Sequence, residues 1–388
     1  MSDFDQVIKR KGTQSYKWDF TKELFGHEDV LPMWVADMDF KSPDAVIAAL
    51  KERVEHGVYG YTGVASKTKK SVQNWLKTRH GWEISADSLD FCSGVVEAMS
   101  IAIQALTEEG DRIVIQPPVY KPFFDMVKYN KRIVVENELV LKDGRYSIDF
   151  EDLAEKLADP SVKMLILCNP QNPSGRVWTK EELAKIGELC LENGVFVFSD
   201  EIHSDILLFG NKHTPFASIS ESFAQNSITA IAPSKTFNLA GLQASAVIIP
   251  DKKILGKFKQ VKRKQGHFSL NIFGITAMEA AYNNGHEWLD SLLLYLEENV
   301  KLVEQYIGEH LKTINVIHPD STYLIWLDCR SLNMTEQQLK KQLLEKGKLA
   351  LELGSKYGKA GEGFVRMNIG CPRQMVLDGL KRLKTALS

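Results

Sequence analysis

The sequence has almost no excess of charge of either sign. Its 388 residues include 48 lysines and arginines and 50 aspartates and glutamates in mixed order, so the formal net charge is −2. It therefore lacks the basic field that holds a nucleic-acid backbone or an anionic membrane surface. We expect neither nucleic acid nor a membrane as a partner.

Cysteine is also scarce. The five cysteines form an odd, scattered set without a CxxC pair: Cys92, Cys168, Cys190, Cys329 and Cys371. A disulfide framework uses an even set at regular spacings, and a zinc site needs clustered ligands. We expect buried thiols in a reducing compartment and no metal site.

Long apolar runs are missing as well. No stretch approaches the roughly 18 apolar residues of a membrane span, and the first 20 residues lack the apolar core of a signal peptide. The cytoplasm is the expected location. The chain is nevertheless 44% hydrophobic and 25% charged, and its length exceeds the usual size of one hydrophobic core, so two domains are expected.

Between about residues 90 and 250, short apolar runs alternate with longer amphipathic segments. The runs that predict strands are 112–115, 164–168, 195–198, 228–232 and 246–249. Such short, continuously apolar runs are typical of strands covered on both faces. Residues 179–193 open with a capping box, Thr179 and Glu182, which predicts a crossover helix. The order predicts an α/β fold with a mostly parallel sheet, in which ligands bind at the carboxyl ends of the strands.

The C-terminal third lacks the regular alternation of short apolar runs and amphipathic segments. It predicts helices at 288–310, 336–346 and 374–386 and strands at 323–327 and 364–369. These elements indicate a smaller α+β domain, and the first 45 residues contain no complete unit of their own. We therefore predict a large domain over 46–285 and a small domain formed by 1–45 together with 286–388.

Four segments are unusually polar for places where the chain should simply turn: CSGVVEA (92–98), NPQNPSG (169–175), DEIH (200–203) and SKTF (234–237). Each alone has an ordinary explanation. The first fits a helix start, the second a turn, and the third a helix cap, while a lone lysine is normally a solvated charge. A lone histidine is more often structural than catalytic.

Together the four segments supply what pyridoxal 5′-phosphate (PLP) needs. Its phosphate binds at a helix N-terminus, its ring nitrogen pairs with a carboxylate, and its aldehyde bonds a lysine. Its phenolic oxygen accepts a hydrogen bond, for example from an asparagine amide. The set therefore indicates a PLP enzyme that acts at the α-carbon of an amino acid.

The order of these motifs resembles the class I and II aminotransferase-like family of PLP enzymes, fold type I, over almost the whole chain (32–372). The shared features are the glycine-led helix, an aromatic residue after two prolines, Asn-Pro-x-Asn-Pro-x-Gly, Asp, Ser-Lys and a C-terminal Arg. PMWVADMD (32–39), YGY (59–61), DEIH (200–203) and RMNIG (366–370) look like the carbon-sulfur lyase branch, the MalY/PatB-type cystathionine β-lyases.

The resemblance implies a role for each motif residue. Lys235 would form the Schiff base with the cofactor and act as the catalytic lysine. Asp200 would pair with the ring nitrogen, and Tyr120 would stack on the ring. Arg366, together with Asn172, would bind the substrate carboxylate.

The same resemblance assigns the rest of the cofactor contacts. Asn172 would bond the phenolic oxygen, and Tyr61 would reach the phosphate of the neighbouring subunit's cofactor, which implies a homodimer with shared active sites. The phosphate would be bound by backbone N–H groups and a hydroxyl, from Gly94, Val95, Val96 and Ser234.

Two positions depart from many relatives. His203 stands where they have tyrosine, so among side chains only Asn172 is assigned to the phenolic oxygen, with His203 as a further cofactor contact. Gln243 and Ala232 stand where many relatives have arginine and serine, so phosphate binding is less fully accounted for.

The lyase branch implies β-elimination, which cleaves cystathionine or another S-substituted cysteine to pyruvate, ammonia and a thiol. The residues themselves leave an aminotransferase open as the alternative, because both reactions begin with loss of the α-proton. A regulatory protein is disfavoured, since no DNA-binding module precedes residue 30. A nicotinamide-dependent dehydrogenase is disfavoured because the glycine-rich run 358–363 lacks the third glycine and a following helix.

Overall fold

The structure is a computed structural model that describes residues 3–387. Its centre is a seven-stranded sheet in the order β2-β10-β9-β8-β7-β3-β4, in which only β10 runs antiparallel to its neighbours. The strands are β2 (Leu89–Cys92), β3 (Arg112–Ile115), β4 (Ile133–Glu136), β7 (Val162–Cys168), β8 (Phe196–Asp200), β9 (Ser227–Ile231) and β10 (Ser245–Ile248). The predicted α/β fold with a mostly parallel sheet is confirmed.

The sequence pattern predicted five of these strands and missed β2 and β4. Strand β2 reads LDFC and contains the charged Asp90, which interrupts the apolar run. Strand β4 lies at the edge of the sheet, where Ile133 and Glu136 are exposed. Neither strand is apolar throughout, and a continuous apolar run was the signal used to find the others.

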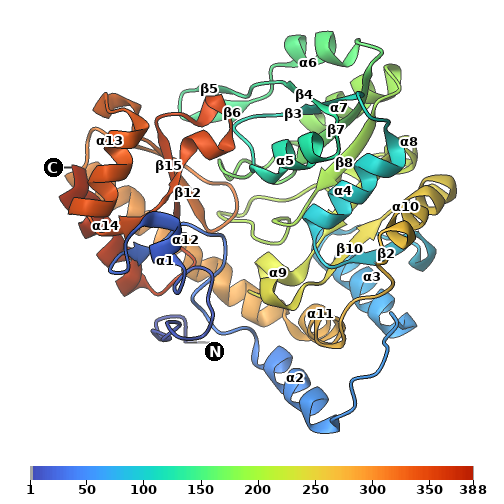
Figure 1. The fold of residues 1–388 in the computed structure, drawn as a ribbon, viewed down its shortest axis with the longest axis horizontal. Coiled ribbons are helices and arrows are strands. Elements are labelled where there is room, and N and C mark those ends of the chain that lie inside the picture. The colour runs from blue at the N-terminus through green and yellow to red at the C-terminus, as the bar shows by residue number, and fades with distance from the viewer. Residues whose placement is uncertain (1–2, 388) are drawn as a thin grey trace.

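Helices cover both faces of this sheet (Figure 1). Along β7, Met164 and Ile166 face a core with α4, α5 and α10, whereas Leu165 and Leu167 face a second core with α6 and α7. The helices of this part are α2 (Asp44–His56), α3 (Ser66–His80), α4 (Val95–Leu106), α5 (Pro122–Tyr129), α6 (Phe150–Leu157), α7 (Lys180–Glu192), α8 (Glu221–Gln225), α9 (Pro233–Thr236), α10 (Lys252–Lys264) and α11 (Ile272–Asn284). The side chains of a strand alternate between its faces, so the apolar run of β7 serves both cores.

The predicted crossover helix is α7. The Thr179 hydroxyl accepts a hydrogen bond from the Glu182 N–H, and the Glu182 carboxylate accepts one from the Thr179 N–H, so both halves of the capping box are present. The helix leads directly into β8, at whose end Asp200 lies.

The C-terminal part contains a second, antiparallel sheet in the order β11-β12-β15-β14. Its strands are β11 (Asn315–Ile317), β12 (Leu324–Asp328), β14 (Glu352–Leu353) and β15 (Phe364–Asn368). The helices beside it are α12 (His286–His310), α13 (Glu336–Lys341), which continues as a π-helix over Gln342–Lys346, and α14 (Arg373–Leu387). The run 358–363 lies between β14 and β15 and opens no α-helix.

The N-terminal segment lies along this second part (Figure 1). After α1 (Thr21–Phe25), strand β1 (Leu31–Pro32) pairs in parallel with β13 (Leu349–Ala350). A buried ion pair between Lys17 Nζ and Asp39 Oδ2, at 2.6 Å, holds the two ends of the segment together. The domain boundaries given above stay a prediction.

In the described part of the chain, every helix is too short or too polar to cross a membrane.

Candidate active site

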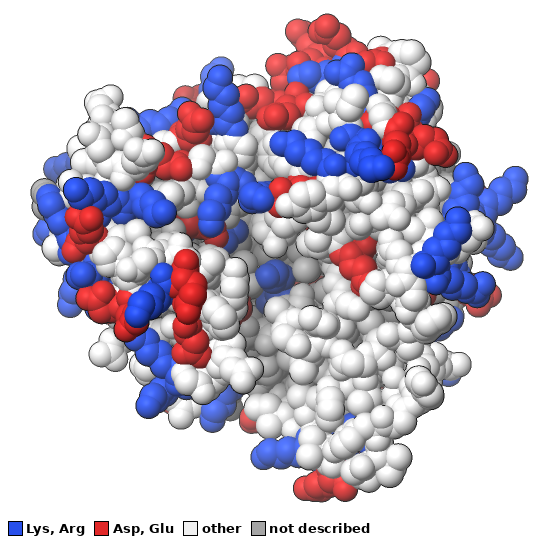
Figure 2. All heavy atoms as spheres, viewed as in Figure 1, with Lys and Arg blue, Asp and Glu red and all other residues white. Residues whose placement is uncertain are grey.

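A pocket of about 480 Å³ opens at the carboxyl ends of β7, β8 and β9. The N-terminal segment and the small sheet close its other sides, and Figure 2 shows the molecule hollowed at this place. The predicted site residues that line the pocket are Gly94, Val95, Val96, Tyr120, Asn172, Asp200, His203, Ser234, Lys235 and Arg366. Residues as far apart in the sequence as Gly94 and Arg366 therefore meet at one edge of the sheet, where ligands of such folds bind.

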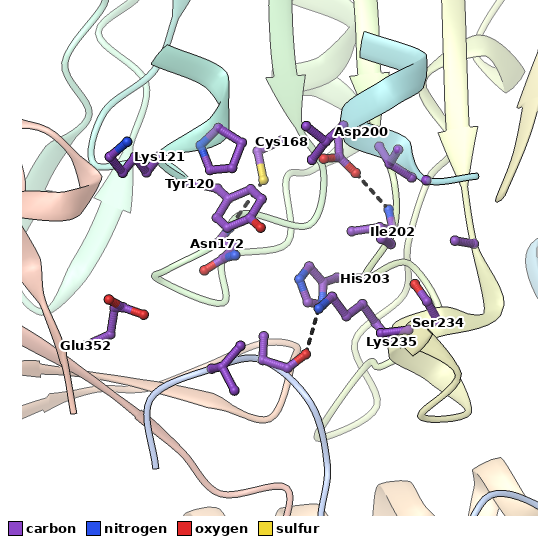
Figure 3. Close-up of a pocket in the computed structure, with 18 of the residues that line it drawn as sticks. Tyr120, Lys121, Cys168, Asn172, Asp200, Ile202, His203, Ser234, Lys235 and Glu352 are labelled. Atoms are coloured by element: carbon purple, nitrogen blue, oxygen red, sulfur yellow. Dashed lines mark hydrogen bonds between the residues drawn. The ribbon is translucent and has the colours of Figure 1, made fainter. Parts of the chain in front are cut away.

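Lys235 lies in α9, the short helix that follows β9. Its Nζ donates a hydrogen bond to the carbonyl of Ala36 at 2.6 Å (Figure 3). Burial, and then the positive charge of Arg366, lowers the pKa of the Lys235 amine to about 8. An amine with a lowered pKa is more often neutral, and only the neutral form bonds to an aldehyde.

Asp200 is the last residue of β8 and is buried. Burial raises the pKa of its carboxyl to about 7, although the Ile202 N–H donates a hydrogen bond to Oδ1 at 3.1 Å. Within residues 3–387, that N–H is the one hydrogen-bond partner of the side chain. A buried carboxylate with so few partners suits a cationic group in the pocket, such as a protonated pyridine nitrogen.

His203 lines the pocket together with Lys235 and Arg366, and its side chain is buried. Burial, followed by the charges of these two neighbours, lowers the pKa of its imidazole to about 3, so the ring is neutral at physiological pH. Its Nδ1 has no hydrogen-bond partner among the described residues. A buried polar atom without a partner leaves a place for a ligand atom.

Arg366 lies on β15 and reaches into the pocket from the small sheet. Its guanidinium donates to Asn172 Oδ1 at 3.0 Å and to the carbonyl of Trp34 at 2.8 Å. Its Nε is buried and has no acceptor within the described chain. These two hydrogen bonds hold the guanidinium in place and use two of its five N–H groups, and Asn172 lines the same pocket.

The N-terminus of α4 forms one wall of the pocket. Gly94 is its N-cap, and the backbone N–H groups of Val95 and Val96 belong to its first turn, which has no acceptor within the helix. Gln243 and Ala232, the two positions that depart from many relatives, also line the pocket. The helix N-terminus and Ser234 are therefore present together in the pocket, as the sequence predicted.

Tyr61 does not line this pocket in one protomer. Its side chain is fully exposed, on the loop between α2 and α3, beside a separate surface hollow that Tyr59 and Phe268 also line. The loop carries Tyr61 away from the strand ends, so within one chain it lies apart from the other predicted site residues.

Several lining residues escaped the sequence reasoning. They are Tyr16, Ala36, Lys121, Asp125, Glu352, Lys356 and Tyr357. Glu352 and Lys356 come from the edge of the small sheet, and they reach the pocket because β14 pairs with β15 and places Glu352 opposite Arg366. No short motif marks these positions, so only strand register could have found them.

The residues present fit PLP. A lysine with a lowered pKa, a buried carboxylate that suits a cation, a neutral histidine with an unpaired nitrogen and a free helix N-terminus lie around one cavity. Within the described residues, no cluster of His, Cys, Asp and Glu is suited to bind a metal ion.

Known proteins resemble the chain over its full length. Residues 28–383 match the family model described as aminotransferase class I and II. The chain is 54% identical to cystathionine beta-lyase PatB of Bacillus subtilis (strain 168), over 99% of this chain and 100% of that protein. A PLP-bound protein from Clostridium difficile 630, provisionally named an aminotransferase, superposes with a TM-score of 0.98 at 44% identity, covering both chains fully. The PLP-bound C-S lyase from Staphylococcus hominis gives a TM-score of 0.94 at 32% identity, over 100% of this chain and 98% of that one.

Proposed function

Since this chain belongs to the aminotransferase class I and II family, we propose that it is a PLP-dependent carbon-sulfur β-lyase. It cleaves L-cystathionine or related S-substituted cysteines to pyruvate, ammonia and a thiol. The single observation that carries the choice of reaction is the 54% identity to a cystathionine β-lyase over 99% of the chain, with the pocket residues described above in place.

The bound cofactor supplies an electron sink that stabilises negative charge at the substrate α-carbon. Asp200 would pair with the protonated ring nitrogen and keep the proton on it. His203 and Asn172 face the same pocket and donate to oxygen atoms of the bound molecules. The N-terminus of α4 binds the phosphate through its free N–H groups.

Arg366 and Lys235 act on the substrate itself. Arg366 binds the α-carboxylate, and its bonds to Asn172 and to the Trp34 carbonyl fix the orientation of the guanidinium. Lys235 would remove the α-proton of the substrate with its neutral Nζ, a form that the lowered pKa favours. Its neighbour, the Ala36 carbonyl, holds Nζ on this side of the pocket.

The β-elimination balances without a redox partner. The Cα–H and Cβ–S bonds break, the electron pair of the Cβ–S bond leaves with sulfur, and the thiolate takes up one proton. A thiolate is a competent leaving group because the pKa of a thiol is about 8.5. The unsaturated amine that remains tautomerises and takes up water, which yields pyruvate and ammonia.

Stoichiometry separates this reaction from transamination. The enzyme is incubated with cystathionine and no keto acid, and pyruvate, ammonia and thiol are counted per active site. Many equivalents of all three support the lyase, because elimination consumes no second substrate. One equivalent of keto product, with further turnover only after a keto acid is added, would assign the chain to the aminotransferases instead. Lys235→Ala is the negative control.

We also propose a homodimer with shared sites. Tyr61 and Phe268 are large, exposed and close together on one face, and such an apolar patch suits a second copy of the chain. Tyr61 would then reach the phosphate of the partner's cofactor, a role that its exposed position permits. The same proposal accounts for a tyrosine that has no function in the isolated protomer.

The setting that we propose is the cytoplasm and methionine biosynthesis. The five cysteines are buried free thiols, a state that reducing conditions maintain. Cystathionine cleavage releases homocysteine, which differs from methionine by one S-methyl group. The consuming reaction would therefore be a methyl transfer to sulfur.

A further inference from the structure

We propose that the end of the pocket away from Lys235 is a second amino-acid subsite, which binds the charged distal end of a zwitterionic thioether. The inference rests on the proposed lyase function and adds to it the recognition of the leaving half of the substrate. Two pairs of opposite charge form this subsite, Lys121 with Asp125 and Lys356 with Glu352, and all four side chains line the pocket.

The first pair belongs to the large-sheet side. Lys121 follows Tyr120 directly and precedes α5, and Asp125 lies in the first turn of that helix. The Lys121 Nζ and Asp125 Oδ2 atoms are 2.5 Å apart. The pair therefore lies next to Tyr120, the ring assigned to stack on the cofactor.

The second pair belongs to the small sheet. Glu352 lies on β14 directly opposite Arg366 on β15, and its Oε2 is 4.0 Å from the Arg366 guanidinium. Lys356 lies four residues later and forms an ion pair with Glu352. Figure 3 shows Lys121 and Glu352 on the side of the pocket away from Ser234 and Lys235.

The charge of this cluster selects its ligand. Two ammonium groups and two carboxylates sum to zero, so the subsite complements a group that carries both signs. Glu352 is mostly buried beside Arg366, and its negative charge repels a further carboxylate at that position. The distal carboxylate of the substrate is therefore expected at the two lysines. Asp125 and Glu352 then accept hydrogen bonds from the distal ammonium.

The two lysines can leave their internal carboxylates for a substrate carboxylate at little cost in free energy. Lys121 and Lys356 are about half exposed, so water reaches both ammonium groups and weakens their attraction to the internal carboxylates. Their long, flexible stems can turn from an internal carboxylate to a substrate carboxylate. The leaving half of cystathionine carries one ammonium and one carboxylate, whereas that of an S-alkylcysteine carries neither. We therefore infer a preference for thioethers with an amino acid at both ends.

Four substrates test the subsite one charge at a time: cystathionine, S-(2-carboxyethyl)-L-cysteine, S-(2-aminoethyl)-L-cysteine and S-ethyl-L-cysteine. In the PLP-loaded double variant K121M/K356M, kcat/KM for the two substrates with a distal carboxylate should fall about tenfold, mainly through KM. S-ethyl- and S-aminoethylcysteine should change less than about twofold, and their turnover shows that the variant is folded. Lys359→Met, an exposed lysine three residues beyond Lys356, is the matched control.

Asp125→Asn should give the reciprocal pattern, with weaker use of cystathionine and the aminoethyl substrate only. Equal loss on all four substrates, or no change in preference relative to Lys359→Met, would overturn the subsite and leave the lyase function intact. If the wild-type enzyme eliminates from none of the four, the lyase function fails, and the subsite fails with it.

Discussion

Burial shifts the pKa of Lys235 and of Asp200 in the two directions that the proposed chemistry uses. The same desolvation lowers the lysine pKa to about 8 and raises the aspartate pKa to about 7, because each neutral form is favoured away from water. The lysine is thereby prepared to act as a nucleophile and base. The aspartate is prepared to receive a positively charged partner.

Lys235 should be the one lysine that bonds the cofactor. The purified protein should be yellow, and borohydride reduction should fix the pyridoxyl group on the peptide that contains Lys235. Lys235→Ala should lower kcat by roughly 10²- to 10⁴-fold, since it removes the proton-transfer group. Lys253→Ala, an exposed lysine on α10, should retain full activity. Label recovered on any other lysine would refute the assignment.

Asp200 should reveal its environment through the pH dependence of stability in cofactor-free protein. Its folded pKa of about 7 lies above the unfolded value of 3.8, so the folded state binds the extra proton between these pH values. That contribution to the free energy of unfolding is lost as the pH rises from about 4 to 7. The Asp200→Asn side chain cannot ionise, so its free energy of unfolding lacks this loss. Relative to the wild type, the variant should become more stable as the pH rises through this window, by at most about 4 kcal/mol.

Urea unfolding of both proteins at pH 5 and pH 8 measures this gain. His203 titrates in the opposite direction, since its depressed pKa of about 3 makes acid destabilising, but this contribution is common to both proteins and cancels. A difference between variant and wild type that does not change with pH would contradict the assigned environment of Asp200.

At the scale of the element, the site depends on strand ends and on the helices that lead into them. Asp200 ends β8, and α7 feeds β8 directly. The capping box of α7 is exposed to solvent, so it affects helix stability without touching the pocket. Stability and chemistry are therefore separable at this helix.

Thr179→Ala should lower the free energy of unfolding by about 1 kcal/mol, because the N–H of Glu182 loses its acceptor. Denaturant unfolding measures the change, and kcat/KM should stay within about twofold of the wild type. Thr179→Ser keeps the hydroxyl and serves as the control. A variant as stable as the wild type would show that the cap contributes nothing at this position.

At the scale of the whole molecule, the proposed dimer would complete each site with Tyr61 of the other chain. Tyr61→Phe should lower activity about tenfold through loss of a charge-assisted hydrogen bond, and Lys235→Ala should be inactive. Mixing the two should form hybrids in which one site has both Lys235 and Tyr61. Random exchange should then restore about a quarter of wild-type activity, since half of the dimers carry one intact site of two.

Light scattering gives the mass of the assembly, and Tyr59→Phe on the same loop is the matched control for Tyr61→Phe. A fully active monomer would rule the arrangement out. Hybrids with no more activity than the separate variants would show that Tyr61 serves no site in the partner.

Local pattern alone determined much of this protein. Continuous apolar runs located five strands of the large sheet, because a strand covered on both faces must be apolar throughout. The box of Thr179 and Glu182 located α7, since capping is a contact between near neighbours. The polar segments predicted Lys235, Asp200 and Asn172 as site residues, and the three line one pocket; the resemblance of their order pointed to the family.

Other features depended on contacts between distant parts of the chain, which no local pattern encodes. Strands β2 and β4 are interrupted or lie at an edge, and only pairing makes them strands. Glu352 and Lys356 enter the pocket through the register of β14 with β15, and Ala36 through the docking of the N-terminal segment. The tertiary structure also decided the pKa of Asp200, because desolvation depends on every residue packed around it.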